Sequence, residues 1–208
     1  MIKARLFACV TLALAAGQAS GAIITFEFGG VITEVDDAAS VLPPDVQVGS
    51  LFSGSYTFDS TMPDLYPNDP RIGKYDSGAD SLAFQIASLP LIESGAGNGY
   101  MQVYNDYLSF GDRIDIATVG VQTMDYYIAE FVIGLAEYSG TILSDDSLPL
   151  TPPNILVFDS LSMFLHAKGP DNENIVVRGN LTYFIPEPTT LILAMFALFL
   201  RFPRRRYS

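Results

Sequence analysis

Apolar and polar residues alternate one by one along much of this chain, and this pattern limits the possible fold more than any other feature. In the segment 24–28 (ITFEF), for example, Ile24, Phe26 and Phe28 share one face. Because successive side chains of a β-strand point to opposite faces of its sheet, the pattern predicts half-buried strands. It recurs at 52–59, 82–86, 113–117 and 177–183, where Val177, Leu181 and Tyr183 share the face opposite Arg178, Asn180 and Thr182.

Segments rich in proline and glycine separate these runs and favour turns. The best helix candidate, 126–138, is rich in Tyr, Ile, Phe and Val, which favours a buried strand or a strand pair instead. We therefore predict roughly eight to ten short strands in an all-β fold, an antiparallel β-sandwich or jelly-roll-like domain made of two sheets.

The N-terminus has the composition of a secretory signal. Lys3 and Arg5 precede an apolar stretch from Leu6 to Ala16, and small residues follow as far as Ala22. This order predicts a signal peptide over 1–22 that is removed after export, with a buried N-terminal helix as the alternative. The only cysteine, Cys9, would leave with it, so the domain 23–185 has no thiol for a disulfide, a nucleophile or a metal ligand.

The domain 23–185 is strongly acidic. Only Glu187 of the 23 acidic residues lies outside it, whereas six of the 11 Lys and Arg residues lie in the two ends of the chain. Twenty-two acids against five bases give the domain a net charge of about −17. Such a surface repels phosphate backbones, which argues against nucleic-acid binding and favours divalent cations or a basic partner.

The C-terminal segment 186–208 combines a turn-like triplet, an apolar run and clustered arginines. Pro186, Glu187 and Pro188 precede ten consecutive apolar residues, Leu191 to Leu200. A helix over 188–202 would reach about 22 Å, against a hydrocarbon core of about 30 Å, which predicts a short transmembrane helix. The basic residues behind it would stay in the cytoplasm and hold the acidic domain outside. They are Arg201, Arg204, Arg205 and Arg206.

This arrangement resembles the PEP-CTERM sorting signal of exported bacterial proteins. The resemblance covers 186–208, and the segment 48–64 (VGSLFSGSYTFDSTMPD) is similar to one that recurs in domains bearing this tail. It implies that exosortase, a membrane-embedded cysteine transpeptidase of Gram-negative bacteria that make exopolysaccharide, recognises the Pro-Glu-Pro triplet. The protein would be exported across the inner membrane, anchored, processed near the triplet and passed to the cell envelope or extracellular space. A plain single-pass anchor and a C-terminal core helix are the alternatives.

Aspartates gather in and around a proline-rich loop. Asp59, Asp64, Asp69 and Asp76, together with loop carbonyls, would suit the flexible oxygen coordination of Ca²⁺. The alternative is that these residues form turns on a solvated face.

Other chemistry is sparse in the sequence. The only histidine, His166, shares a strand face with Ser162 and Phe164, and no serine stands in a Gly-x-Ser-x-Gly elbow. The tyrosines of 100–107 (YMQVYNDY) suit stacking on sugar rings, although strand tyrosines more often pack on their neighbours. We expect an exported, non-enzymatic envelope or matrix protein without a cofactor. A glycan- or Ca²⁺-binding module is the alternative, and a carboxylate-based hydrolase is the third hypothesis.

Overall fold

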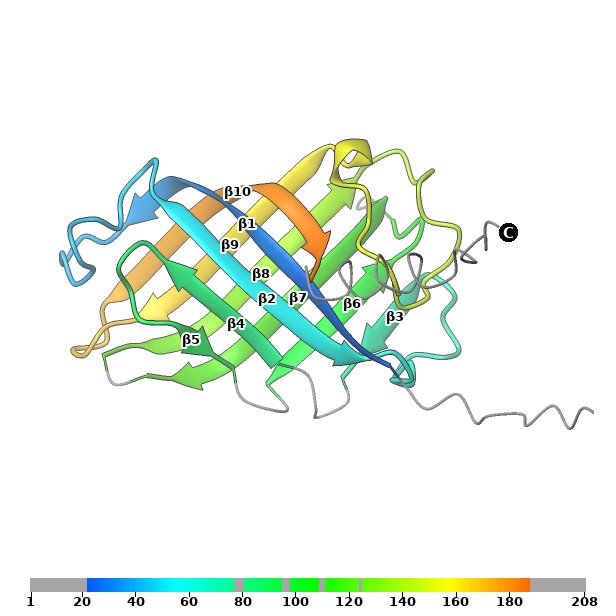
Figure 1. The fold of residues 1–208 in the computed structure, drawn as a ribbon, viewed down its shortest axis with the longest axis horizontal. Coiled ribbons are helices and arrows are strands. Elements are labelled where there is room, and N and C mark those ends of the chain that lie inside the picture. Colours follow the sequence, from blue (N-terminus) through cyan, green and yellow to red (C-terminus); the bar gives the residue numbers. More distant parts are fainter. Residues whose placement is uncertain (1–21, 77–80, 95–97, 109–110, 124, 188–208) are drawn as a thin grey trace, which may run out of the picture.

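The structure, a computed structural model, describes residues 22–187 apart from 77–80, 95–97, 109–110 and 124. Within these ranges the chain is all-β and antiparallel, as the alternation predicts (Figure 1). The elements are β1 (Ile23–Asp36), β2 (Leu51–Asp59), β3 (Ile72–Tyr75), β4 (Ser81–Ile86), β5 (Ile92–Glu93), β6 (Gly99–Tyr104), β7 (Asp112–Gln122), β8 (Tyr127–Glu137), the 3-10 helix η1 (Ile155–Val157), β9 (Ser160–Lys168) and β10 (Asn174–Pro186).

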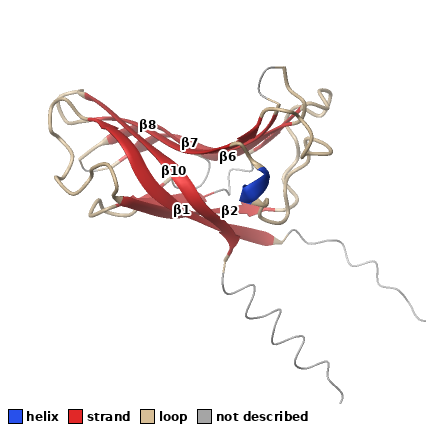
Figure 2. Cartoon of the chain, turned by 90° about the horizontal axis from the view of Figure 1, so that it is seen from above, coloured by secondary structure: helices blue, strands red, loops and turns tan. Residues whose placement is uncertain are grey.

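All ten of these strands belong to one sheet, in the order β3-β6-β7-β8-β9-β10-β1-β2-β4-β5. The sheet bends over on itself, so that β6, β7 and β8 form a layer opposite β1 and β2 (Figure 2). The two sheets expected from the sequence are therefore two halves of one continuous sheet.

The pairing of β1 with β10 shifts register between Gly29 and Gly30 and again between Ile32 and Glu34. Such bulges increase local twist, which helps a sheet to bend.

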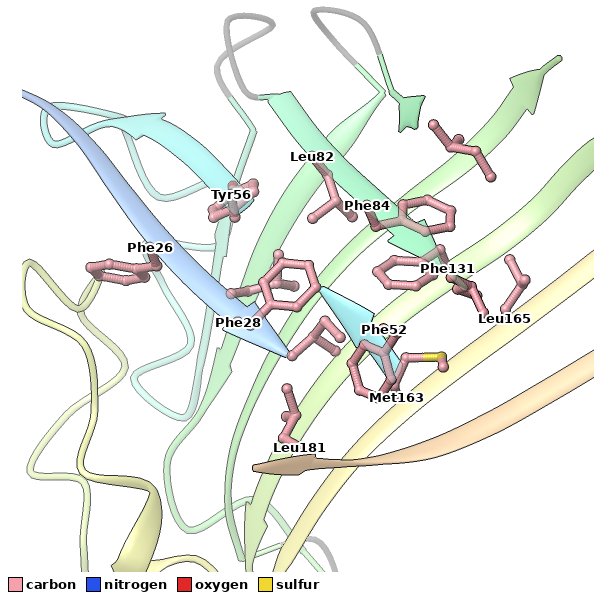
Figure 3. Close-up of a cluster of buried hydrophobic side chains, with 14 of the residues drawn as sticks. Phe26, Phe28, Phe52, Tyr56, Leu82, Phe84, Phe131, Met163, Leu165 and Leu181 are labelled. Carbon is pink, nitrogen blue, oxygen red and sulfur yellow. The ribbon is translucent and has the colours of Figure 1, made fainter. Parts of the chain in front are cut away.

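The hydrophobic core lies between the two layers. Phe84 of β4 and Phe131 of β8 stack with ring centroids 3.8 Å apart, although four strands separate β4 from β8 in the sheet. Figure 3 shows these two rings facing each other, with Phe28 and Phe52 close by. The alternation assigned the inner faces of these strands correctly, because the following residues are all buried: Phe26, Phe28, Phe52, Tyr56, Phe58, Leu82, Phe84, Ile86, Ile114 and Ile116.

The end of β10 departs from the predicted alternation. Val177 and Leu181 are buried, but Tyr183 is 37% exposed and Phe184 takes the next inner position. The register explains this difference: Tyr183 pairs with Gly29 and Leu181 pairs with Gly30, so that Thr182 is an extra residue in β10. A bulge of one residue turns every later side chain to the other face. The prediction that Tyr183 shares a face with Leu181 is therefore wrong.

The ends of the described fold lie close to the predicted domain boundaries. Its first strand starts at Ile23, and its last strand ends at Pro186, one residue beyond the predicted domain 23–185. The segment 126–138 contains a single strand, β8, which covers all of it but its two end residues. Within the described ranges, no helix combines the length and the apolar character that crossing a membrane requires. The signal peptide predicted over 1–22 lies outside the described residues except for Ala22, and so does the predicted transmembrane helix.

Candidate functional site

The first and last strands bring the two ends of the domain together. β1 and β10 are neighbours in the sheet, and Phe26 pairs with Pro186. The Glu187 N–H then donates a hydrogen bond of 3.2 Å to the Thr25 carbonyl. The predicted sorting triplet therefore starts as the end of a strand, with Pro186 as the last residue of β10. The remaining predicted tail residues lie outside the described part of the chain: Pro188, Arg201, Arg204, Arg205 and Arg206.

The aspartates that the sequence assigns to calcium are Asp59, Asp64, Asp69 and Asp76. The backbone N–H and the hydroxyl of Thr61 donate hydrogen bonds to Asp59, which lower the pKa of its carboxyl. Asp64 accepts the backbone N–H of Tyr66, in its own loop, and that of Lys74, in β3. Asp69 pairs with Arg71 at 3.0 Å, and this guanidinium lowers the pKa of Asp69. Among the described residues, no three or more His, Asp or Glu side chains gather as they would around a metal ion. Calcium binding stays a prediction.

The histidine has the surroundings of a solvent-facing strand residue. His166 lies on the outer face of β9 with Ser162 and Phe164, as predicted, because the residues between them are buried. Its Nε2 is 3.5 Å from Oδ1 of Asn174, on the neighbouring strand β10. The hydrogen-bond partner that the structure gives this imidazole is thus a neutral amide, and Glu130 of β8 is its cross-strand neighbour.

The tyrosines of 100–107 lie on the outer face of β6 and on the turn after it. Tyr100 and Tyr104 are half-buried, and the ring centroid of Tyr107 is 5.5 Å from that of Tyr104. Lys74 Nζ stands 4.7 Å from the centroid of Tyr100, and the guanidinium carbon of Arg71 stands 5.6 Å from that of Tyr107. The Lys74–Tyr100 contact joins the edge strand β3 to β6, and the Arg71–Tyr107 contact joins the residues just before β3 and just after β6. They also occupy ring faces that a stacked sugar would need.

Tyr183 offers a different kind of aromatic surface. Across the β1–β10 pair it stands opposite Gly29. A Cβ added to Gly29 would lie 2.5 Å from Cε1 of Tyr183 and 2.5 Å from its hydroxyl oxygen. The Tyr183 ring therefore lies directly on the glycine backbone, and no larger residue at position 29 leaves it room. Because the ring is supported from below and 37% exposed, it presents a fixed aromatic surface to solvent.

Two shallow hollows of about 690 and 450 Å³ flank Tyr183 on the outer face of β1, β2 and β4. Both hollows are lined by Tyr183, Ser53 and Gln85, and Glu27 and Glu93 line the smaller one. We call these two depressions together the Tyr183 hollows. The remaining lining consists largely of small residues, among them Gly30, Gly54, Ser55, Ala83 and Ala87.

The chemistry of the Tyr183 hollows fits a sugar ring. Burial raises the pKa of the Tyr183 hydroxyl, and the Glu27 carboxylate raises it further, so this hydroxyl stays protonated and can donate. The Nε2–H of Gln85 donates a hydrogen bond to the Leu89 carbonyl, and its Oε1 is an acceptor. A sugar has an apolar C–H face that stacks on an aromatic ring and hydroxyls that bond to such side chains around it.

Sequence reasoning missed Tyr183 because plain alternation places it on the inner face. The signal that could have found it is the glycine pair Gly29-Gly30 inside a strand pattern, because glycine in a strand often marks a bulge or a close approach.

Comparison with known proteins gives no relative: no protein-family model, no curated protein and no solved structure matches this chain.

Proposed function

We propose that the protein is an exported, non-enzymatic component of the cell envelope or extracellular matrix, delivered through the sorting segment 186–208. The observation that carries the proposal is the meeting of the two domain ends, where Phe26 pairs with Pro186 and Glu187 bonds to Thr25. A signal before Ile23 and a membrane segment after Glu187 must both reach one bilayer. Adjacent ends allow this without opening any strand of the folded sheet.

The charges of the sequence support the same orientation. The arginine cluster behind Leu200 holds the C-terminus in the cytoplasm, while the domain, with a net charge of about −17, stays outside. Exosortase is the processing partner in this proposal, and it reads the triplet that starts at the end of β10.

Cell fractionation tests this delivery in a Gram-negative host that produces an exosortase. We expect to find the domain in the envelope or in the medium and not in the cytosol. A matched chain that ends at Glu187 keeps every described strand but lacks the apolar run and the arginines. We expect that chain to be released into the periplasm without anchoring. Full-length protein that stays in the cytosol would contradict the proposal.

A second function, binding of neutral sugar chains, is favoured by the Tyr183 hollows. The supported ring supplies the stacking surface, and Ser53, Gln85 and Glu27 supply hydroxyl, amide and carboxylate partners. The carboxylates of Glu27 and Glu93 repel anionic saccharides, so we assign the site to uncharged or amino sugars. A matrix protein with such a site would hold polysaccharide after its delivery.

Replacing Tyr183 with alanine is expected to weaken sugar binding by up to about tenfold, since ring stacking contributes about 0.5 to 1.5 kcal/mol. Tyr183→Phe keeps the ring and should lose much less. Tyr138→Ala is the matched control, because Tyr138 is 62% exposed and does not line the hollows. A glycan array with the three variants and the wild type in parallel provides the measurement. Wild-type protein that binds no glycan would contradict the proposed sugar binding. Tyr183→Ala that binds glycan as tightly as the wild type would show that the sugar does not bind at the Tyr183 hollows.

A further inference from the structure

An apolar groove lies where the two ends of the domain meet. It has a volume of about 810 Å³ and runs between the start of β1, the end of β10 and the segment 150–156. Figure 1 shows the yellow segment before η1 passing beside the ends of these two strands. None of the described residues that line the groove is charged, although the domain as a whole carries about −17 charges. The groove is therefore a neutral area on an acidic surface.

The rim of this groove exposes large aliphatic side chains. Leu156 is 87% exposed, Ile23 66%, Leu150 56% and Ile185 42%. The 3-10 helix η1, which carries Leu156, has no buried residue at all. Single exposed aliphatic residues are common, but several around one apolar groove mark a surface that meets another apolar phase.

The position of the groove indicates what covers it. Pro186 lines the groove, and the apolar run of the tail starts at Leu191. Five residues of extended chain span at most about 18 Å, so the part of the groove at Pro186 lies within this distance of the start of the apolar run. The absence of charge among its described lining residues removes the repulsion that anionic headgroups exert on the rest of the domain.

We infer that this groove and its rim contact the outer leaflet of the inner membrane while the tail is still attached. The inference rests on the proposed function, because it requires an inserted tail. The occupant is the phospholipid interface, in which the side chains of Leu156, Ile23 and Leu150 are immersed at the boundary between headgroups and acyl chains. The domain is thus held with its β1–β10 end against the bilayer, and the triplet lies close to the membrane surface.

Site-specific fluorescence quenching tests this contact. The full chain has one cysteine, so a Cys9→Ser background allows a single new label. Leu156→Cys carries an environment-sensitive fluorophore at the groove. Val48→Cys, in the loop between β1 and β2 at the opposite end of β1, is the matched control because Val48 is 63% exposed. Each labelled chain is reconstituted into phosphatidylcholine–phosphatidylglycerol vesicles, with or without lipid that carries a doxyl quencher near the headgroup.

We expect the label at position 156 to lose most of its emission to the doxyl lipid and the label at position 48 to lose almost none. A chain that floats with the vesicles while position 156 stays unquenched would overturn the inference and leave the sorting tail intact. A chain that does not float would overturn both. A label at position 156 that is already shielded from water without vesicles would also overturn the inference, because protein then covers the groove. Equal quenching at positions 156 and 48 would overturn it as well, because the domain then has no preferred face toward the bilayer.

Discussion

Alanine at both Pro186 and Pro188 will leave the tail on the chain, so that the protein accumulates in the inner membrane instead of reaching the outer envelope or the medium. The physical reason lies in the backbone. Proline fixes φ and has no N–H, and it also restricts the residue before it, so two prolines favour an extended backbone at the triplet and remove two donors from it. Alanine at these positions restores two N–H donors and allows β10 or a helix of the tail to continue through the triplet.

The measurement is the size and the location of the chain in a host with an exosortase. In the Pro186/Pro188 variant we expect the processed form to change from the main species to a minor one. Pro43→Ala/Pro44→Ala is the matched control, since these two prolines lie in the loop between β1 and β2. The thermal midpoints of both double variants should fall by similar, modest amounts, because loss of each proline costs about 1 kcal/mol or less. Unchanged processing of the Pro186/Pro188 variant would contradict recognition of the triplet.

Replacing Asp112 with alanine will destabilise the fold strongly. Asp112 starts β7 and is fully buried. Its Oδ2 accepts the N–H groups of Ile142 and Leu143, each at 2.7 Å, and its Oδ1 accepts the N–H of Asp106 at 3.0 Å. One carboxylate thus ties the segment after β8 to the turn between β6 and β7. Alanine would leave three backbone donors without their acceptor.

We expect the free energy of unfolding to fall by about 3 kcal/mol or more in Asp112→Ala, because hydrogen bonds to a charged group contribute about 1.5 to 3 kcal/mol each and do not add fully. Asp112→Asn keeps one acceptor oxygen and should fall between alanine and the wild type. Asp125→Ala, at an exposed position, should change stability by less than about 0.5 kcal/mol. Urea unfolding followed by far-UV circular dichroism gives these values. A midpoint for Asp112→Ala equal to that of Asp125→Ala would contradict the role assigned to Asp112.

The fold class and most inner faces follow from the sequence because alternation is a local property of each strand. In β7, for example, Ile114 and Ile116 are buried while Arg113 and Asp115 are partly exposed, as the alternation predicts. The pairing of distant strands is not local. The sequences around Phe84 and Phe131 do not indicate that one sheet bends far enough for these two rings to stack, with their centroids 3.8 Å apart. The sequence therefore predicted two sheets where the structure has two halves of one.

The Tyr183 hollows were beyond sequence reasoning for a related reason. The outward direction of Tyr183 depends on the extra residue Thr182, and that bulge is defined only by the register of β10 against Gly29 and Gly30 on β1. The aspartates predicted to bind calcium depend instead on local contacts. Asp59 and Asp69 accept hydrogen bonds from residues two positions later, Thr61 and Arg71, as turn-forming aspartates do.

The intact mass of the protein purified from its host tests the proposed delivery most directly. A chain that has lost the signal at about residue 22 and has been cut close to Pro186 is expected, with the whole sheet from Ile23 onward retained. A mass equal to that of the full 208 residues, in protein recovered from the cytosol, would contradict it.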